Sequence, residues 1–368
     1  MSRVRFLMVG GFLGAGKTTA LARIARHFID CGQRVGLVTN DQAYDLVDTQ
    51  TLRAQGFDVG EVPGACFCCK FNDLVDTIAA LSEDDAPDVI LAEPVGSCTD
   101  LVATVIEPLR QFYRDSFEVG PLTVLLKPEH GAKILSESEG SGFSPKAAYI
   151  FLKQIEEADI VAINKIDKLN SLQCEDIVRL IGQRFPEKST LCVSARTGEG
   201  FEPLLAAMQR EQAEHTSMIA VDYDVYAEGE AELGWLNCSV LLSRSCEKFS
   251  LDDAVVMLLR QLQDALAAAD AEPAHLKAMG QGGDGWAVAN LVSSVGPVEL
   301  SQASGVSTSQ AVLTVNARVA TDPERLAKVV EEQCQSVAQH FAAECRIENM
   351  QCFRPGRPEP THRIRRQS

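Results

Sequence analysis

The chain has 368 residues, of which 46% are hydrophobic and 23% are charged, so it can form packed domains and wholesale disorder is excluded. Acidic residues outnumber basic ones by 51 to 34, and the net charge of −17 disfavours partners such as nucleic acid or an anionic membrane surface. No run of about 18 apolar residues is present, so no membrane-spanning helix is predicted. At about 100–200 residues per domain, the length indicates two or three domains.

Short apolar runs alternate with helical patterns along the first part of the chain. A strand is expected at 3–9 and a helix at 17–29, where Leu21, Ile24 and Phe28 recur at helical spacing. Continuous apolar strands separated by helices are typical of a parallel sheet that helices cover on both faces. The further strands are predicted at 35–39, 87–92, 122–126, 160–163 and 190–193.

The second part of the chain has a different order of elements. Strands are expected at 235–242, 275–279, 286–292, 311–319 and 345–352, with helices at 251–269 and from the capping residue Asp322 to about 341. This order approximates strand–helix–strand–strand–helix–strand, the split ferredoxin-like arrangement. The first part therefore predicts an α/β fold with a mostly parallel sheet, and the second a smaller α+β domain.

A glycine-rich loop connects the first predicted strand to the first predicted helix. Its sequence, GFLGAGKT at residues 11–18, matches G-x-x-x-x-G-K-[ST], the phosphate-binding loop of P-loop NTPases. Backbone N–H groups of such a loop point at phosphate oxygens, and the helix N-terminus favours negative charge. Lys17 is expected to reach the β- and γ-phosphates, and the Thr18 hydroxyl to hold Mg²⁺. The nucleotide-binding residues predicted here are Gly11, Gly14, Ala15, Gly16, Lys17, Thr18 and Thr19.

Asn164, Lys165 and Asp167 belong to an Asn-Lys-x-Asp sequence directly after the strand predicted at 160–163. An ionised carboxylate only accepts hydrogen bonds, and guanine offers two adjacent donors, so Asp167 fits guanine and rejects adenine. Asn164 is expected to brace the pocket and Lys165 to lie along the ring. Ser194 and Ala195 follow the next strand, where their backbone can donate to the guanine oxygen. The predicted nucleotide is GTP.

A second acidic motif, Glu93-Pro94-Val95-Gly96, ends the strand predicted at 87–92. Strand ends on this side of a parallel sheet lie beside the nucleotide. Glu93 is therefore expected to order the attacking water or the Mg²⁺ shell, and the Gly96 N–H to contact the γ-phosphate. The simpler alternative is a turn after a strand.

Three cysteines, Cys66, Cys68 and Cys69, form Cys-x-Cys-Cys between the second and third strands. Within the framework of the other three motifs, this sequence resembles the CobW-type metallochaperone GTPases, relatives of the HypB and UreG nickel-insertion GTPases. The resemblance covers about residues 3–210. It implies a Mg²⁺-dependent GTPase, in which Lys17, Glu93 and the acidic residue after the second strand, Asp41, are catalytic candidates. Intrinsic turnover is expected to be low, because no stabilising arginine is evident in the sequence.

Three thiolates within four residues can converge on one soft cation such as Zn²⁺. A fourth ligand must come from elsewhere: a water, a partner, a second subunit, or a carboxylate such as Glu61. An incomplete shell suits metal transfer better than permanent structure, because an open position admits an exchanging ligand. A buried turn and a redox switch are the two alternatives to a metal site at these thiols.

The function that follows is GTP-dependent delivery of a transition metal to a client metalloprotein in the cytoplasm, where thiols stay reduced. The resemblance also implies that a homodimer can form. The alternatives are a GTPase that serves cobalamin or cobalt metabolism, a nucleotide-dependent thiol sensor, and an ATP-dependent kinase or ligase, against which Asp167 argues. The expected domains are a P-loop GTPase domain at 1–212, an α+β domain at 220–353 and a flexible Arg- and Pro-rich tail at 354–368.

Overall fold

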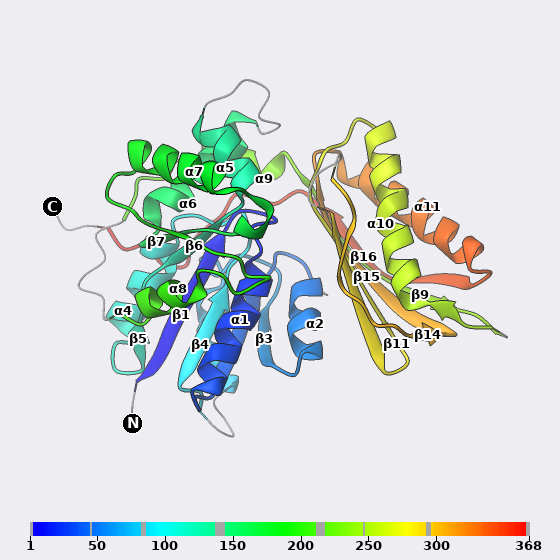
Figure 1. The fold of residues 1–368 in the computed structure, drawn as a ribbon, viewed down its shortest axis with the longest axis horizontal. Coiled ribbons are helices and arrows are strands. Elements are labelled where there is room, and N and C mark those ends of the chain that lie inside the picture. The colour runs from blue at the N-terminus through cyan, green and yellow to red at the C-terminus, as the bar shows by residue number, and fades with distance from the viewer. Residues whose placement is uncertain are drawn as a thin grey trace. The chain divides into compact units, whose positions relative to one another are not determined.

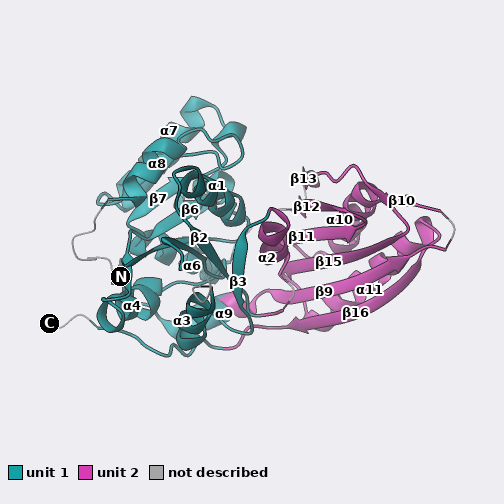
Figure 2. Ribbon diagram, turned by 90° about the horizontal axis from the view of Figure 1, so that it is seen from below, with its two compact units in different colours: residues 1–42, 56–229, 357–368 teal, residues 43–55, 230–356 magenta. Residues whose placement is uncertain are grey.

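The structure is a computed structural model that describes residues 3–44, 46–81, 86–136, 144–210, 218–245, 247–291 and 296–365. The chain forms two compact units, shown in two colours in Figure 2. Unit 1 comprises residues 1–42, 56–229 and 357–368, and unit 2 comprises 43–55 and 230–356. The units differ from the predicted ranges 1–212 and 220–353 in two places, because residues 43–55 belong to unit 2 and residues 357–368 belong to unit 1. The predicted boundary at 212 lies outside the described residues.

Unit 1 is built on a parallel sheet, as predicted. The order of its described strands is β3-β2-β4-β1-β6-β7-β8, with β5 beside β1, and every pair is parallel. Apolar side chains cover both faces, since residues 6–9 of β1 are at most 1% exposed. The strands are β1 (Val4–Gly11), β2 (Val35–Asn40), β3 (Asp58–Val62), β4 (Val89–Glu93), β5 (Phe117–Val119), β6 (Thr123–Leu126), β7 (Ile160–Ile163) and β8 (Ser189–Cys192).

Helices cover the sheet of unit 1 on both faces, with α1 on one side and α3 and α6 on the other (Figure 2). The residues of α1 that the spacing selected, Leu21, Ile24 and Phe28, are buried. A π-helical segment, η1, leads directly into α4. The helices are α1 (Lys17–Asp30), α3 (Phe71–Ala80), η1 (Val102–Ile106), α4 (Glu107–Phe112), α5 (Pro128–Leu135), α6 (Pro145–Glu157), the 3₁₀ turn η2 (Ile166–Lys168), α7 (Ser171–Arg184), α8 (Phe201–Met208) and α9 (Tyr223–Ala231).

Unit 2 is an antiparallel sheet of order β13-β12-β11-β15-β9-β16, with α10 and α11 packed on one face (Figure 1). The order β16-β9-β15-β11 is that of the ferredoxin-like fold, which confirms the predicted arrangement, and β12 and β13 extend it at one edge. The elements are β9 (Gly234–Ser243), α10 (Leu251–Ala268), β11 (Pro273–Gly282), β12 (Gly285–Leu291), β13 (Glu299–Gln302), β15 (Gln310–Val319), α11 (Pro323–His340) and β16 (Glu344–Phe353), with the short pair β10 (Phe249–Ser250) and β14 (Ser307–Thr308).

The segment that follows Gln42 packs within unit 2 before the chain returns to unit 1 at Gly56. It contains α2 (Val47–Ala54). The Val47 N–H donates to Asn316 Oδ1 on β15 at 2.6 Å, and Asp48 forms an ion pair with Lys277 of β11. The loop after β2, which the sequence analysis placed beside the nucleotide, therefore continues directly into the second unit.

The C-terminal tail differs from the flexible segment predicted at 354–368. Residues 357–364 are held against unit 1 by ion pairs and by backbone hydrogen bonds. Two of the arginines that suggested solvation, Arg357 and Arg363, bind carboxylates of unit 1 instead. Among the described residues, no helix has both the length and the apolar character needed to cross a bilayer.

Candidate functional site

The phosphate loop depends on glycines for both backbone conformation and space. Gly11, Gly14 and Gly16 have φ angles of 135°, 73° and 91°, which favour glycine. A Cβ at Gly11 would lie 2.3 Å from the Leu125 carbonyl oxygen, and one at Gly16 would lie 2.5 Å from Asn164 Nδ2. The loop is thus pressed against the ends of β6 and β7. The first N–H groups of α1 lie at its end, where they suit an anionic ligand.

Lys17, Thr18 and Glu93 meet where β1 and β4 end side by side. All three are buried, with 8%, 7% and 6% of their surface exposed. The Thr18 hydroxyl donates to Glu93 Oε1 at 3.3 Å, and Lys17 Nζ lies 3.9 Å from the same oxygen. A Cβ added at Gly96 would lie 3.1 Å from Lys17 Nζ. The structure therefore brings together the residues predicted for Mg²⁺ and the γ-phosphate, and the hydroxyl and carboxylate oxygens suit Mg²⁺.

The predicted base-binding residues also form one network. Asn164 Nδ2 donates to the Ala15 carbonyl at 2.8 Å, and the Ala195 N–H donates to Asn164 Oδ1 at 2.9 Å. Ser194 Oγ donates to Asp167 Oδ1 at 2.6 Å, which orients this exposed carboxylate. One amide side chain thus links the phosphate loop to the loop after β8, as its bracing role requires.

Arg23 supports the base pocket and was missed by the sequence analysis. Its guanidinium donates to the carbonyl oxygens of Ala195 and Arg196, at 2.8 and 2.9 Å. Arg23 lies on α1 outside the phosphate-loop motif, and nothing in its local sequence indicates a partner 172 residues away. Lys165, by contrast, was predicted as a base-binding residue. Its φ of 64° places it in the left-handed region directly before the 3₁₀ turn η2.

The cysteine segment is braced by the side chain of Asn40, at the end of β2. Asn40 Nδ2 donates to the carbonyl oxygens of Val62 and Ala65, both at 2.7 Å, and its Oδ1 accepts from the Phe67 N–H at 2.8 Å. One buried amide therefore satisfies three backbone groups around the first cysteine. Buried polar groups of this kind are costly to leave unpaired, so the bonds fix the segment against β2.

The two residues after Asn40 extend this contact to a sulfur. Gln42 Nε2 donates to Cys66 Sγ at 3.4 Å, and Asp41 between them is buried. The loop that contains the catalytic candidate Asp41 is therefore bonded to the predicted metal-binding segment.

The thiols of Cys68 and Cys69 lie together, with Cys68 Sγ 3.7 Å from Cys69 Sγ. Hydrogen bonding with the Cys68 thiol, and then with the Cys98 thiol, holds the pKa of Cys66 well below its ordinary value despite burial. Donation to Cys66 raises the pKa of Cys68. No three side chains among the described residues already surround a common point as metal ligands.

The C-terminal tail lies along the cysteine segment. The Thr361 N–H donates to the Cys68 carbonyl at 2.8 Å, and Thr361 Oγ1 donates to the Cys69 carbonyl at 2.9 Å. The Glu359 N–H donates to Cys69 Sγ at 3.2 Å. Hydrogen bonding with the neighbouring Cys68 thiol, and to a smaller extent donation from the Glu359 N–H, lowers the pKa of Cys69.

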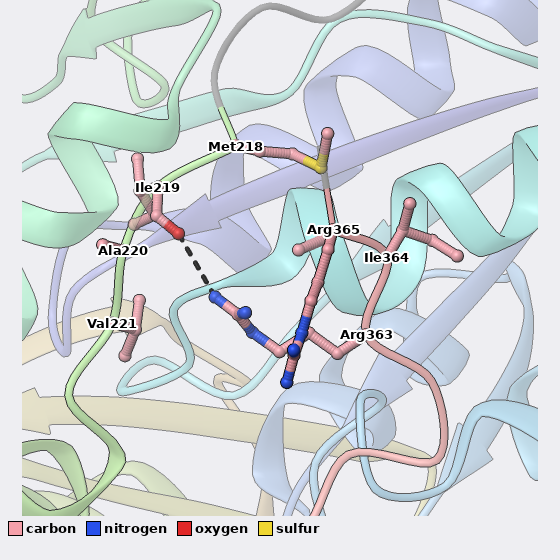
Figure 3. A pocket seen from close by; sticks show the side chains of 8 residues that line it. Met218, Ile219, Ala220, Val221, Arg363, Ile364 and Arg365 are labelled. Atoms are coloured by element: carbon pink, nitrogen blue, oxygen red, sulfur yellow. Dashed lines mark hydrogen bonds between the residues drawn. The ribbon is translucent and has the colours of Figure 1, made fainter. Parts of the chain in front are cut away.

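The same tail continues onto the segment that follows the Glu93 motif. Arg363 Nε donates to Asp100 Oδ2 at 2.6 Å, and the Tyr223 hydroxyl donates to the same oxygen at 2.7 Å. The Ile364 N–H then donates to the Ala103 carbonyl at 2.8 Å. Figure 3 shows Arg363 bonded to the Ile219 carbonyl in a pocket of about 340 Å³ between the tail and residues 218–221.

Helix α6 holds the loop between Gly96 and Asp100 from the other side. Gln154 Nε2 donates to the carbonyl oxygens of Gly96 and Cys98, at 3.1 and 2.9 Å. One turn further along α6, Glu157 accepts from the Thr99 hydroxyl at 3.0 Å. Burial raises the pKa of Glu157 to about 8, so its carboxyl is mainly protonated at neutral pH.

A second lysine lies near the phosphate loop. Lys127, at the end of β6, has its Nζ 3.2 Å from His130 Nε2, and both residues are buried. Burial, and then the nearby lysine charges, lower the pKa of His130 to about 2. His130 is therefore a neutral ring at physiological pH, and it packs edge-to-face with the ring of Phe12 in the loop.

Comparisons with known proteins give consistent results. The family profile described as CobW/HypB/UreG, nucleotide-binding domain, matches residues 5–191, just over half of the chain. A zinc chaperone CobW from Sinorhizobium is 23% identical over 62% of this chain and 72% of its own length. The zinc chaperone YeiR from Escherichia coli is 27% identical over 44% of this chain and 46% of its own length.

Two solved structures are also similar. HypB from Helicobacter pylori, crystallised in complex with nickel, is 20% identical, covers 58% of this chain and 91% of its own, and gives a TM-score of 0.40. Zn(II)-bound YjiA GTPase from Escherichia coli is 14% identical, covers 93% and 99%, and gives a TM-score of 0.39.

Proposed function

Because the chain belongs to the CobW/HypB/UreG family of nucleotide-binding proteins, we propose that it is a Mg²⁺-dependent GTPase that binds a divalent transition metal and delivers it to a client protein. One observation carries the proposal. The loop after β2 is bonded to the cysteine segment, through Asn40 to its backbone and through Gln42 to Cys66 Sγ. A nucleotide-dependent change in this loop therefore acts directly on a metal ligand.

The hydrolytic part of the site needs little covalent chemistry from the protein, because phosphoryl transfer is catalysed mainly by positioning and charge stabilisation. Lys17 neutralises charge on the β- and γ-phosphates, and the N–H groups at the start of α1 bind phosphate oxygens. Glu93 orients the attacking water. Thr18 and Glu93 would hold Mg²⁺, with Asp41 after β2 as a further candidate ligand, and the ion supplies further charge neutralisation when bound. Slow turnover is expected, because the hydrogen bond and the ion pair that join Lys17, Thr18 and Glu93 involve no arginine.

The base is guanine because Asp167, oriented by Ser194 Oγ, accepts from its N1–H and its amino group. Asn164 and Arg23 hold the loop after β8 close to this carboxylate. The Ser194 and Ala195 N–H groups, which were predicted to bind the guanine oxygen, instead donate to the Glu199 carbonyl and to Asn164 Oδ1. Adenine places an acceptor opposite the carboxylate, so ATP is a poor substrate.

The cargo is bound by Cys66, Cys68 and Cys69. Thiolates select soft and borderline cations, and two of the relatives are named zinc chaperones, which supports zinc as the first candidate. Loading requires deprotonated sulfur, which the lowered pKa values of Cys66 and Cys69 favour. The cycle needs reduced thiols and so belongs in a reducing compartment such as the cytoplasm.

Two measurements on the full chain test this function. Phosphate release from GTP is expected to exceed release from ATP by at least about 100-fold and to fall in Glu93→Gln while GTP binding persists. Zinc purified with the protein under reducing conditions is expected at one equivalent. The triple substitution of Cys66, Cys68 and Cys69 by serine should abolish it, and Cys31→Ser, at an exposed thiol, should not. Hydrolysis of ATP as fast as GTP, or zinc retained in the triple variant, contradicts the proposal.

A further inference from the structure

Arg23 of α1 holds the loop that follows β8 with two hydrogen bonds. Its Nε donates to the Ala195 carbonyl at 2.8 Å, and its Nη2 donates to the Arg196 carbonyl at 2.9 Å. A guanidinium presents its N–H donors in one rigid plane, so the two bonds fix both the position and the orientation of the loop. The guanidinium also lies over the Phe201 ring, 5.6 Å from its centroid, where the loop ends and α8 begins.

The loop is shaped to approach this guanidinium closely. Gly198 has a φ of 91°, and a Cβ added there would lie 2.6 Å from Arg23 Nη1. Two backbone bonds close the loop on itself. The Gly198 N–H donates to the Ser194 carbonyl, and the Ser194 N–H donates to the Glu199 carbonyl, both at 2.8 Å. The loop is therefore a compact turn, and Arg23 fixes where this turn lies relative to α1.

The hydroxyl of Ser194 connects this loop to the base-binding carboxylate. It accepts from the Thr197 N–H at 3.1 Å and donates to Asp167 Oδ1 at 2.6 Å. The Thr197 N–H occupies one acceptor site of the hydroxyl, and the single hydroxyl proton is directed to the carboxylate. Ser194 is buried, whereas Asp167 is exposed. The orientation of Asp167 therefore depends on the position of the loop.

We propose that Arg23 is a positioning residue that determines the preference for guanine. Arg23 holds the loop, and the Ser194 hydroxyl of that loop keeps the Asp167 carboxylate facing the N1–H and the amino group of guanine. This role rests on the base pocket of the function proposed above, and it extends that pocket to a residue outside every nucleotide-binding motif.

The position of Arg23 on α1 also relates the base pocket to the phosphate loop. The helix begins at Lys17, and Arg23 lies on its second turn. Backbone hydrogen bonds join successive turns of a helix, so the two side chains start from one rigid element. The loop after β8 is therefore held at a fixed separation from the phosphate loop. A nucleotide whose phosphates bind at Lys17 then presents its base to a carboxylate that is already oriented.

The test compares GTP with inosine triphosphate, ITP, whose base keeps the N1–H and lacks the amino group. Competition against a fluorescent GDP analogue on the full chain measures both affinities. The wild type is expected to bind GTP at least about tenfold more tightly, because the carboxylate forms one more charge-assisted hydrogen bond. In Arg23→Ala this ratio should fall at least about threefold. A change that only destabilised the fold would lower both affinities equally and leave the ratio unchanged.

Three further variants define the route of the effect. Arg26→Ala is the matched control and should keep the wild-type ratio, because Arg26 is an exposed arginine of the same helix that lies over the Phe57 ring. Arg23→Lys keeps the charge without the planar fork, so its ratio should fall nearly as far as in Arg23→Ala. It also decides the matter if Arg23→Ala does not fold. Ser194→Ala should lower the ratio too, and the addition of Arg23→Ala should then cause little further loss.

The outcomes separate this inference from the function on which it rests. A wild type that binds ITP as tightly as GTP, or an unchanged ratio in both Arg23 variants, overturns the role of Arg23 and leaves the GTPase intact. Additive losses in Arg23→Ala and Ser194→Ala overturn the connection through the hydroxyl. A wild type that binds ATP as tightly as GTP overturns the base pocket itself.

Discussion

Asn164 Nδ2 donates a hydrogen bond to the Ala15 carbonyl at 2.8 Å, and so joins the end of β7 to the phosphate loop. The same side chain accepts from the Ala195 N–H at 2.9 Å. A Cβ at Gly16 would lie 2.5 Å from this amide, so the loop must approach Asn164 closely. The phosphate and base halves of the nucleotide site are therefore held at a fixed separation by one buried residue.

Asn164→Ala is expected to weaken GTP binding by about tenfold to 100-fold, because it leaves two buried backbone groups unpaired at about 1–3 kcal/mol each. Isothermal titration of GTP and GDP measures the change. The control is Asn170→Ala, which removes the capping side chain of α7. It should lower the free energy of unfolding by about 1 kcal/mol and leave nucleotide affinity unchanged. Equal GTP affinity in the Asn164 variant and the wild type contradicts the bracing role.

Asp167→Asn is expected to change the base that the site prefers. The variant loses two charge-assisted hydrogen bonds from guanine, which is worth about 100-fold in GTP affinity or more. Its amide can instead donate to the additional carbonyl of xanthine, so XTP should bind more tightly than GTP. Competition between the two nucleotides against a fluorescent analogue measures the preference. A variant that still prefers GTP shows that Asp167 does not contact the base.

Glu157 makes stability depend on pH. Burial, and to a lesser extent the nearby Asp100 charge, raises its pKa to about 8. Between about pH 4.5 and 8, the native state therefore keeps a proton on Glu157 that the unfolded chain has already released. Stability from this group is present at low pH and is lost as pH rises through the folded pKa, with a slope of at most about 1.4 kcal/mol per pH unit.

Urea unfolding of the wild type and of Glu157→Gln at pH 5.5, 6.5 and 7.5 measures this contribution. The wild type is expected to lose stability relative to the glutamine variant as pH rises, because glutamine remains neutral. Parallel pH profiles for the two proteins are inconsistent with a protonated Glu157.

Arg363→Ala is expected to release the tail from the cysteine segment. Its partner Asp100 is fully buried, so loss of the guanidinium leaves a buried carboxylate whose remaining side-chain partner among the described residues is the Tyr223 hydroxyl. Alkylation of Cys69, followed by mass spectrometry, should become several-fold faster. Arg357→Ala is the matched control, because its ion pair with Asp224 is exposed and contributes little. The same alkylation rate in wild type and Arg363→Ala contradicts the tail's role.

Some parts of the site could be predicted because their chemistry is local. The phosphate loop, Asn164 and Asp167 stand in short motifs whose strands and helices the apolar spacing also predicts, and the structure places them together. Residues 43–55 and the tail could not be placed in this way. Their positions depend on contacts such as Val47 with Asn316, or Thr361 with Cys69, which join residues about 270 to 290 apart.

Arg23 illustrates the same limit. By sequence it is one charged residue of α1, outside every motif. Only its bonds to the carbonyl oxygens of Ala195 and Arg196 relate it to the base pocket. The sequence thus indicates the kinds of ligand that the protein binds, and the fold shows which side chains connect them.

The proposed function requires that the nucleotide site and the metal site are thermodynamically linked. Competition titration of zinc against a chelator, with the full chain bound to GDP or to a non-hydrolysable GTP analogue, tests it most directly. Zinc affinities are expected to differ by at least about fivefold between the two states, with the reciprocal change in nucleotide affinity when zinc is bound. Equal zinc affinities in both states would contradict it.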